Sequence, residues 1–220
     1  RLFISAPLLF QLSQIFRPDH RHTTIHVQNV PADEAAGRTR QEDGRATQFL
    51  HLAPELRRRG HDVTALTDLT NKRETQTPTL RYKFEAQTVD AAACRLGRNY
   101  TQQSDRGVVV ARACKRLRDE KGYVPDVIFG HSGWGETLFL KEVWPEAKLI
   151  VYAEYYYRGV GADTGFDPEF GTGGFDQVMI AQGRAAHLAH AIVHADLAVS
   201  QQRGARAVHT AETRGGAGEL

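Results

Sequence analysis

Apolar and β-branched residues gather in six short runs along the chain, and polar, glycine or proline residues bound each run. The runs 126–131 and 148–154 are continuously apolar, which is typical of strands buried on both faces of a sheet. The other runs are short, and some alternate between apolar and polar positions, as half-buried strands do. The pattern therefore predicts strands at 23–29, 61–68, 80–85, 126–131, 148–154 and 196–200.

The segments between these runs show the helical spacing of apolar residues. From Phe49 onward, apolar residues recur at i, i+3, i+4 and i+7, which predicts an amphipathic helix that Gly60 ends. A longer region carries a similar apolar stripe in its later half and is interrupted near Gly97. The predicted helices cover 47–60, 88–121, 135–144 and 176–195.

Strands that alternate with helices predict an α/β fold with a mostly parallel sheet covered by helices on both faces. We expect one such three-layer domain over 23–200, with a loop insertion at about 31–46. The segment 1–22 is predicted to be poorly ordered or atypical. The segment 201–220 is rich in Gly, Ala and Arg without periodicity, and we expect it to be a disordered tail.

Two polar residues follow the two most apolar strands. His131 and Glu154 each end one of these runs. In open parallel sheets, ligands bind beyond the carboxyl ends of the strands, so both residues are candidate site residues. Two interpretations of His131 stay open: a turn histidine that caps the next helix, or a side chain that serves a functional site.

The segment 131-HSGWGE-136 connects a predicted strand to a predicted helix and is a candidate binding turn. Gly133 and Gly135 allow the backbone to approach a ligand closely, and free N–H groups at a helix start attract negative charge. Trp134 offers a face for a sugar ring if it is exposed, and belongs to the core if it is buried. Glu136 either contacts a ligand or offsets the helix dipole. The segment matches neither the dinucleotide fingerprint nor the P-loop.

The glycine-rich run 154–170 is aromatic and acidic, and long loops inside compact α/β domains are usually functional. Asp163, Asp167 and Glu169 lie in this loop. They suggest a paired-carboxylate or metal site, but their spacing fits no calcium loop, and turn capping is the favoured interpretation.

Three histidines of the last predicted helix, His187, His190 and His194, share one helical face. The helix lacks the H-E-x-x-H motif of zinc proteases, so packing along an alanine-rich helix is favoured over a metal site. The chain also shows no G-x-S-x-G motif and no credible Cys/His nucleophile pair.

Composition sets further bounds. The 220 residues are 41% apolar and 25% charged, as in an ordinary globular domain, and the net charge of +2 argues against a nucleic-acid partner. Two cysteines without C-x-x-C spacing favour a reducing compartment, so we expect a cytoplasmic protein. The apolar N-terminal segment 1–16 is too short to span a bilayer, and the sequence does not show peripheral membrane association.

The stretch 125-PDVIFGHSGWGETLFLKEVWPEAKLIVYAEYYYRGVGADTGFDPEF-170 resembles the N-terminal domain of bacterial family 4, group 1, glycosyltransferases. The similar features are the histidine, the G-W-G-E motif, and the G-A-D-x-G-F-D-P-E-F motif flanked by tyrosine and arginine. The resemblance extends more weakly to 47–67 and to the helix before Pro125, and it ends at Ser200. It implies a Rossmann-like domain that forms the N-terminal half of a GT-B fold.

In such enzymes the N-terminal domain holds the acceptor, and a C-terminal domain holds the nucleotide-sugar donor. The resemblance implies retaining transfer of a sugar to a sugar or glycan acceptor, with no cofactor and no metal in this chain. It implies a catalytic, cleft-lining role for His131. The acceptor-binding residues implied by the same resemblance are Gly133, Trp134, Gly135, Glu136, Glu154, Tyr156 and Arg158.

Two departures from the family pattern shape these expectations. The segment 32–47 separates the first strand from the helix that follows it in the family, and nothing after Ser200 resembles a donor domain. We therefore expect an incomplete glycosyltransferase that is inactive alone. A non-catalytic sugar- or partner-binding module stays open as the alternative. A nucleotide-dependent oxidoreductase is disfavoured because the first strand is followed by no glycine fingerprint.

Overall fold

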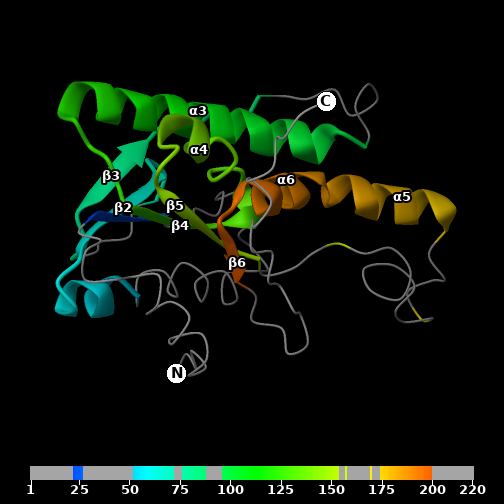
Figure 1. Ribbon diagram of the computed structural model, residues 1–220. Coiled ribbons are helices and arrows are strands. Elements are labelled where there is room, and N and C mark those ends of the chain that lie inside the picture. The colour runs from blue at the N-terminus through cyan, green and yellow to red at the C-terminus, as the bar shows by residue number, and fades with distance from the viewer. Residues whose placement is uncertain are drawn as a thin grey trace, which may run out of the picture.

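The computed structural model describes the backbone of 22–26 and residues 52–71, 76–87, 96–153, 157, 169 and 174–199. Within these ranges, six strands form one sheet in which every neighbouring pair is parallel (Figure 1). The strand order is β3-β2-β1-β4-β5-β6. The strands are β1 His22–His26, β2 Asp62–Asp68, β3 Thr79–Tyr82, β4 Val127–His131, β5 Lys148–Tyr152 and β6 Leu197–Val199.

This strand order confirms the predicted α/β fold with a parallel sheet. The chain runs outward from β1 through β2 to β3, then returns to the other side of β1 and continues through β4, β5 and β6. The order in which strands join the sheet therefore reverses between β1 and β4. Ligands of doubly wound sheets bind at the carboxyl ends of the two strands that flank such a switch point. All six predicted strands are present. β5 ends at Tyr152, however, two residues before the predicted end at Glu154.

Helices cover both faces of the sheet. Figure 1 shows the labelled helices together on one face and a short helix over 52–58, drawn in cyan, on the other. The predicted helix 176–195 is interrupted at Ala185, where one turn residue separates two helices. The labelled helices are α3 Arg98–Lys121, α4 Leu140–Val143, α5 Phe175–Arg184 and α6 Ala186–His194.

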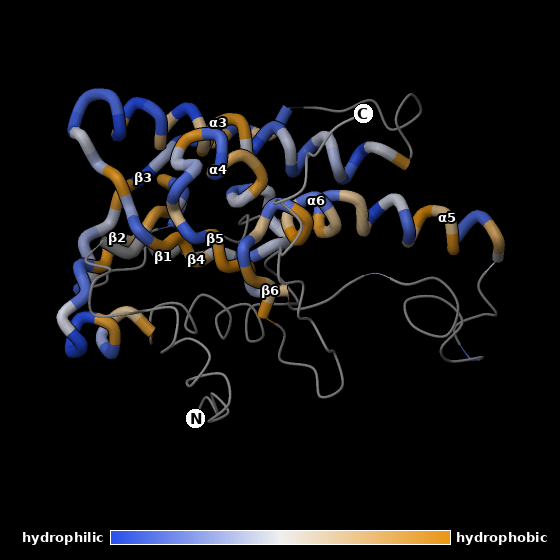
Figure 2. The backbone as a smooth tube through the Cα atoms, in the orientation of Figure 1, coloured by the Kyte–Doolittle hydropathy of each residue, from blue (hydrophilic) through white to orange (hydrophobic). Residues whose placement is uncertain are grey.

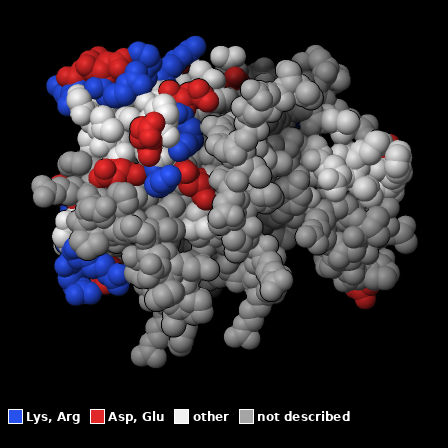
Figure 3. Space-filling view, in the orientation of Figure 1, with Lys and Arg blue, Asp and Glu red and all other residues white. Residues whose placement is uncertain are grey.

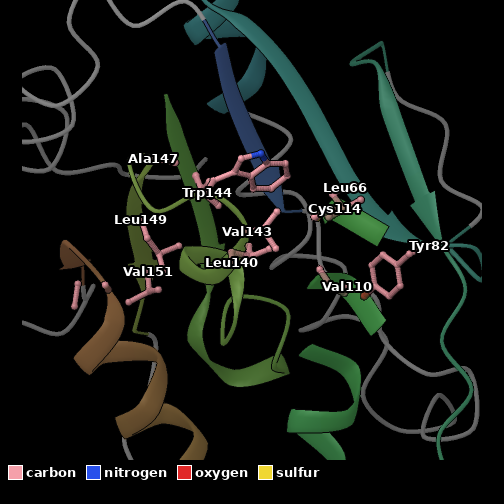
Figure 4. Close-up of a cluster of buried hydrophobic side chains, with 13 residues drawn as sticks. Leu66, Tyr82, Val110, Cys114, Leu140, Val143, Trp144, Ala147, Leu149 and Val151 are labelled. Atoms are coloured by element: carbon pink, nitrogen blue, oxygen red, sulfur yellow. The ribbon is translucent and has the colours of Figure 1, made fainter. Parts of the chain in front are cut away.

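Each face of the sheet buries its own apolar cluster, because side chains alternate between the two faces along every strand. On one face, Leu52 and Leu56 of the short helix pack with Val127 and Ile150. On the other, side chains of α3 and α4 pack against side chains of β5, as Figure 4 shows for Val110, Leu140 and Leu149. The apolar segments of Figure 2 follow this arrangement, with hydrophobic colour along much of the sheet. Burial of one such side chain contributes about 1.5–3 kcal/mol.

The exposed charged side chains balance locally. Over the end of α3, where Lys115, Arg118 and Asp119 form ion pairs, Figure 3 shows basic and acidic groups side by side. At the end of the 52–58 helix, Arg58 and Arg59 both pair with Glu55. Among the described helices, none combines the length and the apolarity that crossing a membrane requires.

Candidate functional site

His131 is the last residue of β4, where the sequence pattern predicts it. In the sheet, β4 lies between β1 and β5, and His131 is opposite Tyr152, the last residue of β5. The two rings are 5.7 Å apart between centroids. Because the order in which strands join the sheet reverses between β1 and β4, His131 lies at the strand ends where doubly wound sheets bind ligands. The ring is partly buried, so it belongs to this edge of the sheet and not to the core.

One nitrogen of the His131 ring caps the turn that follows. The N–H of Gly133 donates to His131 Nδ1 at 2.8 Å, and His131 is the N-cap residue of the short 3-10 helix η2, Ser132–Trp134. The capping interpretation of this histidine is therefore confirmed. A ring nitrogen that accepts a hydrogen bond carries no proton, so the neutral ring holds its hydrogen on Nε2. The cap thus assigns the ring hydrogen to Nε2, and a functional role remains compatible with it.

The turn after η2 does not form the predicted helix 135–144. Only α4 is helical there, and it is preceded by turns with i to i+3 hydrogen bonds such as Leu138 N–H to the Gly135 carbonyl. Gly135, whose φ of +83° is left-handed, is the C-cap of η2, so it cannot be the first residue of the predicted helix. A Cβ on Gly135 would lie 2.0 Å from the Gln103 carbonyl oxygen of α3. Gly135 therefore serves close packing of the turn against α3.

The packing is reciprocal, because α3 also places a glycine at this contact. A Cβ on Gly107 would lie 2.6 Å from the Gly135 carbonyl oxygen and 3.0 Å from the Phe139 ring. Glycine inside a helix costs about 0.5–1 kcal/mol relative to alanine. The contact with the turn gives a physical reason for tolerating that cost.

Glu136 is buried inside the protein, with 6% of its surface exposed. The Tyr82 hydroxyl donates to Glu136 Oε1 at 2.9 Å, and Arg106 Nη1 lies 3.6 Å from the same oxygen. Burial raises the pKa of Glu136, and the Arg106 guanidinium and the Tyr82 hydroxyl oppose that rise. Burial and the Glu136 charge raise the pKa of Tyr82 as well. The suggested role of Glu136 in offsetting a helix dipole is wrong, since no helix begins there.

Three separate segments meet at this carboxylate. Tyr82 ends β3, Arg106 lies in α3, and Glu136 lies in the turn after β4. The Arg106 guanidinium also lies over the Phe84 ring, 4.5 Å from its centroid. The sequence pattern did not identify Tyr82 or Arg106. The only signal available was an arginine among the apolar positions of a helix, which by itself names no partner.

His187 of α6 holds the same turn from the other side. Its Nε2 lies 3.1 Å from the Gly133 carbonyl oxygen, and since a carbonyl only accepts, Nε2–H is the donor. The side chain is 3% exposed. Its other nitrogen, Nδ1, is buried against the Arg184 carbonyl, without a well-formed hydrogen bond to any described residue. Burial lowers the pKa of His187, which keeps the ring neutral.

The two other histidines of this helix face also pack, as predicted. The Tyr100 hydroxyl lies 2.9 Å from His190 Nδ1, and the Phe139 ring meets the His190 ring edge to face. The His190 and His194 rings are 4.8 Å apart between centroids. Within the described ranges, no cluster of three His, Cys, Asp or Glu side chains has the geometry of a metal site.

The remaining candidates divide between described and undescribed segments. Trp134 is partly buried in η2, between the two extremes considered from the sequence, and Glu169 is exposed. Cys114 is buried in the core, and burial raises the pKa of its thiol to about 12. The other predicted positions lie outside the described residues: Cys94, Glu154, Tyr156, Arg158, Asp163 and Asp167.

The strand order and the polar residues at the β4 end define the chain as a Rossmann-like α/β domain with a candidate site at its topological switch point. The family model of the Glycosyl transferase family 4 group matches residues 59–214, more than half of the chain. The chain belongs to this family. The match extends beyond Ser200, which corrects the expectation that the resemblance ends there.

A comparison with curated proteins found no match. Among solved structures, the chain is similar to CalG4, the calicheamicin glycosyltransferase, with 16% identity and a TM-score of 0.40 over 63% of this chain and 34% of that one. It is also similar to LpCGTa, solved in complex with UDP, with 12% identity and a TM-score of 0.42 over 84% of this chain and 46% of that one. The chain thus spans less than half of the length of either structure.

Proposed function

We propose that this chain is the acceptor-binding half of a GT-B glycosyltransferase, which transfers a sugar from a nucleotide-sugar donor to a sugar or glycan acceptor with retention at the anomeric carbon. The observation that carries the proposal is the position of His131. In a member of a glycosyltransferase family, it ends a strand at the topological switch point of the sheet. The fold alone hosts many activities, so the family supplies the reaction class and the residue supplies the place.

His131 is the residue that we assign to the reacting groups. Its Nε2–H can donate a hydrogen bond to a substrate oxygen that gains negative charge as the sugar is transferred. With no protein nucleophile, this half of the enzyme contributes positioning and electrostatic stabilisation. Trp134, partly buried three residues later, is the surface that we assign to stacking on an acceptor sugar.

The other predicted acceptor residues then have two kinds of role. Gly133, Gly135 and Glu136 hold the turn in place through contacts with β3, α3 and α6. Glu154, Tyr156 and Arg158 follow β5, the strand next to β4, and we retain them as cleft-lining residues because the resemblance places them there.

A second, nucleotide-sugar-binding domain completes the site in this proposal, so the 220-residue chain alone transfers no sugar. The chain then needs no cofactor of its own. We also retain a cytoplasmic location, which the cysteine usage supports.

An NMR titration of the isotope-labelled 220-residue chain with methyl glucoside, UDP-glucose and GDP-mannose tests this proposal. We expect millimolar binding of the simple sugar with shifts of the Trp134 indole and His131 ring signals, weak nucleotide-sugar binding and no transfer. Nucleotide-sugar hydrolysis or transfer by this chain would overturn the division of labour. A second test is whether the coding sequence beyond residue 220, in any frame, encodes a second Rossmann-like domain. If it encodes no second Rossmann-like domain and no sugar binds, the chain is a non-catalytic module instead.

A further inference from the structure

Gly133 is held on both sides by histidine rings. Its N–H donates to His131 Nδ1 at 2.8 Å, and its carbonyl oxygen accepts from His187 Nε2 at 3.1 Å. The two histidines come from β4 and α6, far apart in the sequence. One glycine therefore connects the buried His187 ring of α6 to the His131 ring at the end of β4.

The space around Gly133 is also restricted. A Cβ on this residue would lie 2.9 Å from His131 Cε1 and 3.0 Å from His131 Nδ1, so the His131 ring lies directly against the glycine. Glycine is the residue with the greatest backbone freedom. Without an anchor on its carbonyl side, Gly133 can rotate and withdraw the N–H that His131 Nδ1 accepts.

We propose that His187 is a positioning residue for His131: its bond to the Gly133 carbonyl fixes the glycine whose N–H keeps the His131 ring oriented, with its hydrogen on Nε2. His187 is 3% exposed, so we assign it no direct contact with a ligand. The lowered pKa of His187 agrees with this role, because a neutral ring adds no charge behind the turn. The ring form of His131 is a property of the unliganded chain, so the inference rests on the proposed function only for its consequence in catalysis.

The tautomer of His131 is the direct test. Long-range proton–nitrogen correlation spectra of the labelled 220-residue chain distinguish Nε2–H from Nδ1–H rings, and a His131→Gln variant assigns the signal. We expect the wild-type His131 ring to be a single Nε2–H form. In His187→Phe, which keeps volume but removes the donor, we expect a mixture with Nδ1–H. His187→Gln, which retains an N–H donor, should restore the single form.

Two controls separate positioning from general loss of structure. His190→Phe alters the neighbouring ring of the same helix, which contacts Tyr100 and not Gly133, and should leave the His131 tautomer unchanged. If His187→Phe does not fold, His187→Leu, which also lacks the donor, takes its place, and the through-bond coupling between the Gly133 amide nitrogen and His131 Nδ1 is compared between wild type and this variant. An unchanged His131 ring in folded His187→Phe, or an Nδ1–H ring in the wild type, would overturn the proposal. Sugar transfer by this chain, or a failure to bind sugars, would count against the proposed function and not against this proposal, so the two proposals fail independently.

Discussion

The turn after β4 carries a titratable side chain at each end, and the two ends differ in their surroundings. His131 is partly buried at the sheet edge and uses one ring nitrogen to cap the turn. Glu136 is sealed inside, with its carboxylate on Tyr82 and Arg106. Both residues qualified from the sequence as candidates for contact with a ligand. Their burial keeps the His131 end as the candidate for ligand contact, whereas the Glu136 end holds the turn in place.

A short turn can thus be partly accessible and still be held in place. Its own hydrogen bonds are few, since η2 has only three residues. Rigidity comes from neighbours: α3 packs on Gly135, α6 bonds Gly133, and the end of β3 bonds Glu136. Such supporting contacts are what preorganised sites require. Three substitutions test this assignment, ordered by the expected loss of stability.

Gly135→Ala should have the largest effect. The new Cβ meets the Gln103 carbonyl oxygen at 2.0 Å, and φ stays at +83° unless the turn moves. Left-handed strain of about 1–2 kcal/mol and overpacking of about 1–3 kcal/mol together predict a loss of about 2–5 kcal/mol. Urea denaturation of the wild type and the variant measures the difference.

Gly60→Ala is the matched control for this substitution. Gly60 has a similar φ of +90°, but nothing lies within 4 Å of the added Cβ. Only the strain of about 1–2 kcal/mol is expected there. Equal losses at the two glycines would show that contact with α3 does not fix the turn.

The sequence predicted the architecture better than the turn. Continuous apolar runs and alternating helices predicted the parallel sheet, because burial on two faces leaves a signal in every strand residue. The same reasoning placed His131 correctly, since a strand end follows directly from the pattern. It failed at 135–144, where apolar spacing indicated a helix. The spacing of apolar residues carries no information on the left-handed φ of Gly135 or on its close contact with Gln103.

The partners of the turn were beyond prediction for a related reason. Glu136 lies 54 residues from Tyr82 and 30 residues from Arg106 along the chain. Gly133 lies 54 residues from His187. No local periodicity records such pairings. His187 was recognised as a packed histidine, yet its hydrogen bond to Gly133 depends on how α6 is laid across the sheet. Long-range contacts of this kind need either a structure or aligned relatives.

Glu136→Gln should have an intermediate, pH-dependent effect. The pKa of Glu136 is raised in the folded protein, so the folded state binds this proton more tightly than the unfolded chain does. The resulting stabilisation is fully present below the ordinary glutamate pKa and is lost as pH rises through the folded value. The stability of the wild type relative to Glu136→Gln should therefore fall with rising pH, by at most about 1.4 kcal/mol per unit.

Glu55→Gln is the control, because its pKa is shifted in the opposite direction. Hydrogen bonds from Arg58 and Arg59 lower the pKa of Glu55 to about 2. Its stabilisation is present above the ordinary pKa and is lost as pH falls toward the folded value, so the slope has the opposite sign. Urea midpoints of the three proteins between about pH 3 and pH 8 give both slopes. A Glu136 slope with the sign of Glu55 would show that Arg106 and Tyr82 outweigh burial at that carboxylate.

His131→Ala should cost the least stability. The variant loses the cap on Gly133, and caps of this kind contribute about 0.5–2 kcal/mol, commonly about 1. His131→Asn separates the two uses of the side chain, because an asparagine oxygen can accept from Gly133 N–H but places no donor where Nε2 is. We expect Asn to recover most of the stability lost in Ala, while both variants lose the response of this edge of the sheet to sugars. A loss in His131→Ala as large as that in Gly135→Ala would assign both ends of the turn to architecture.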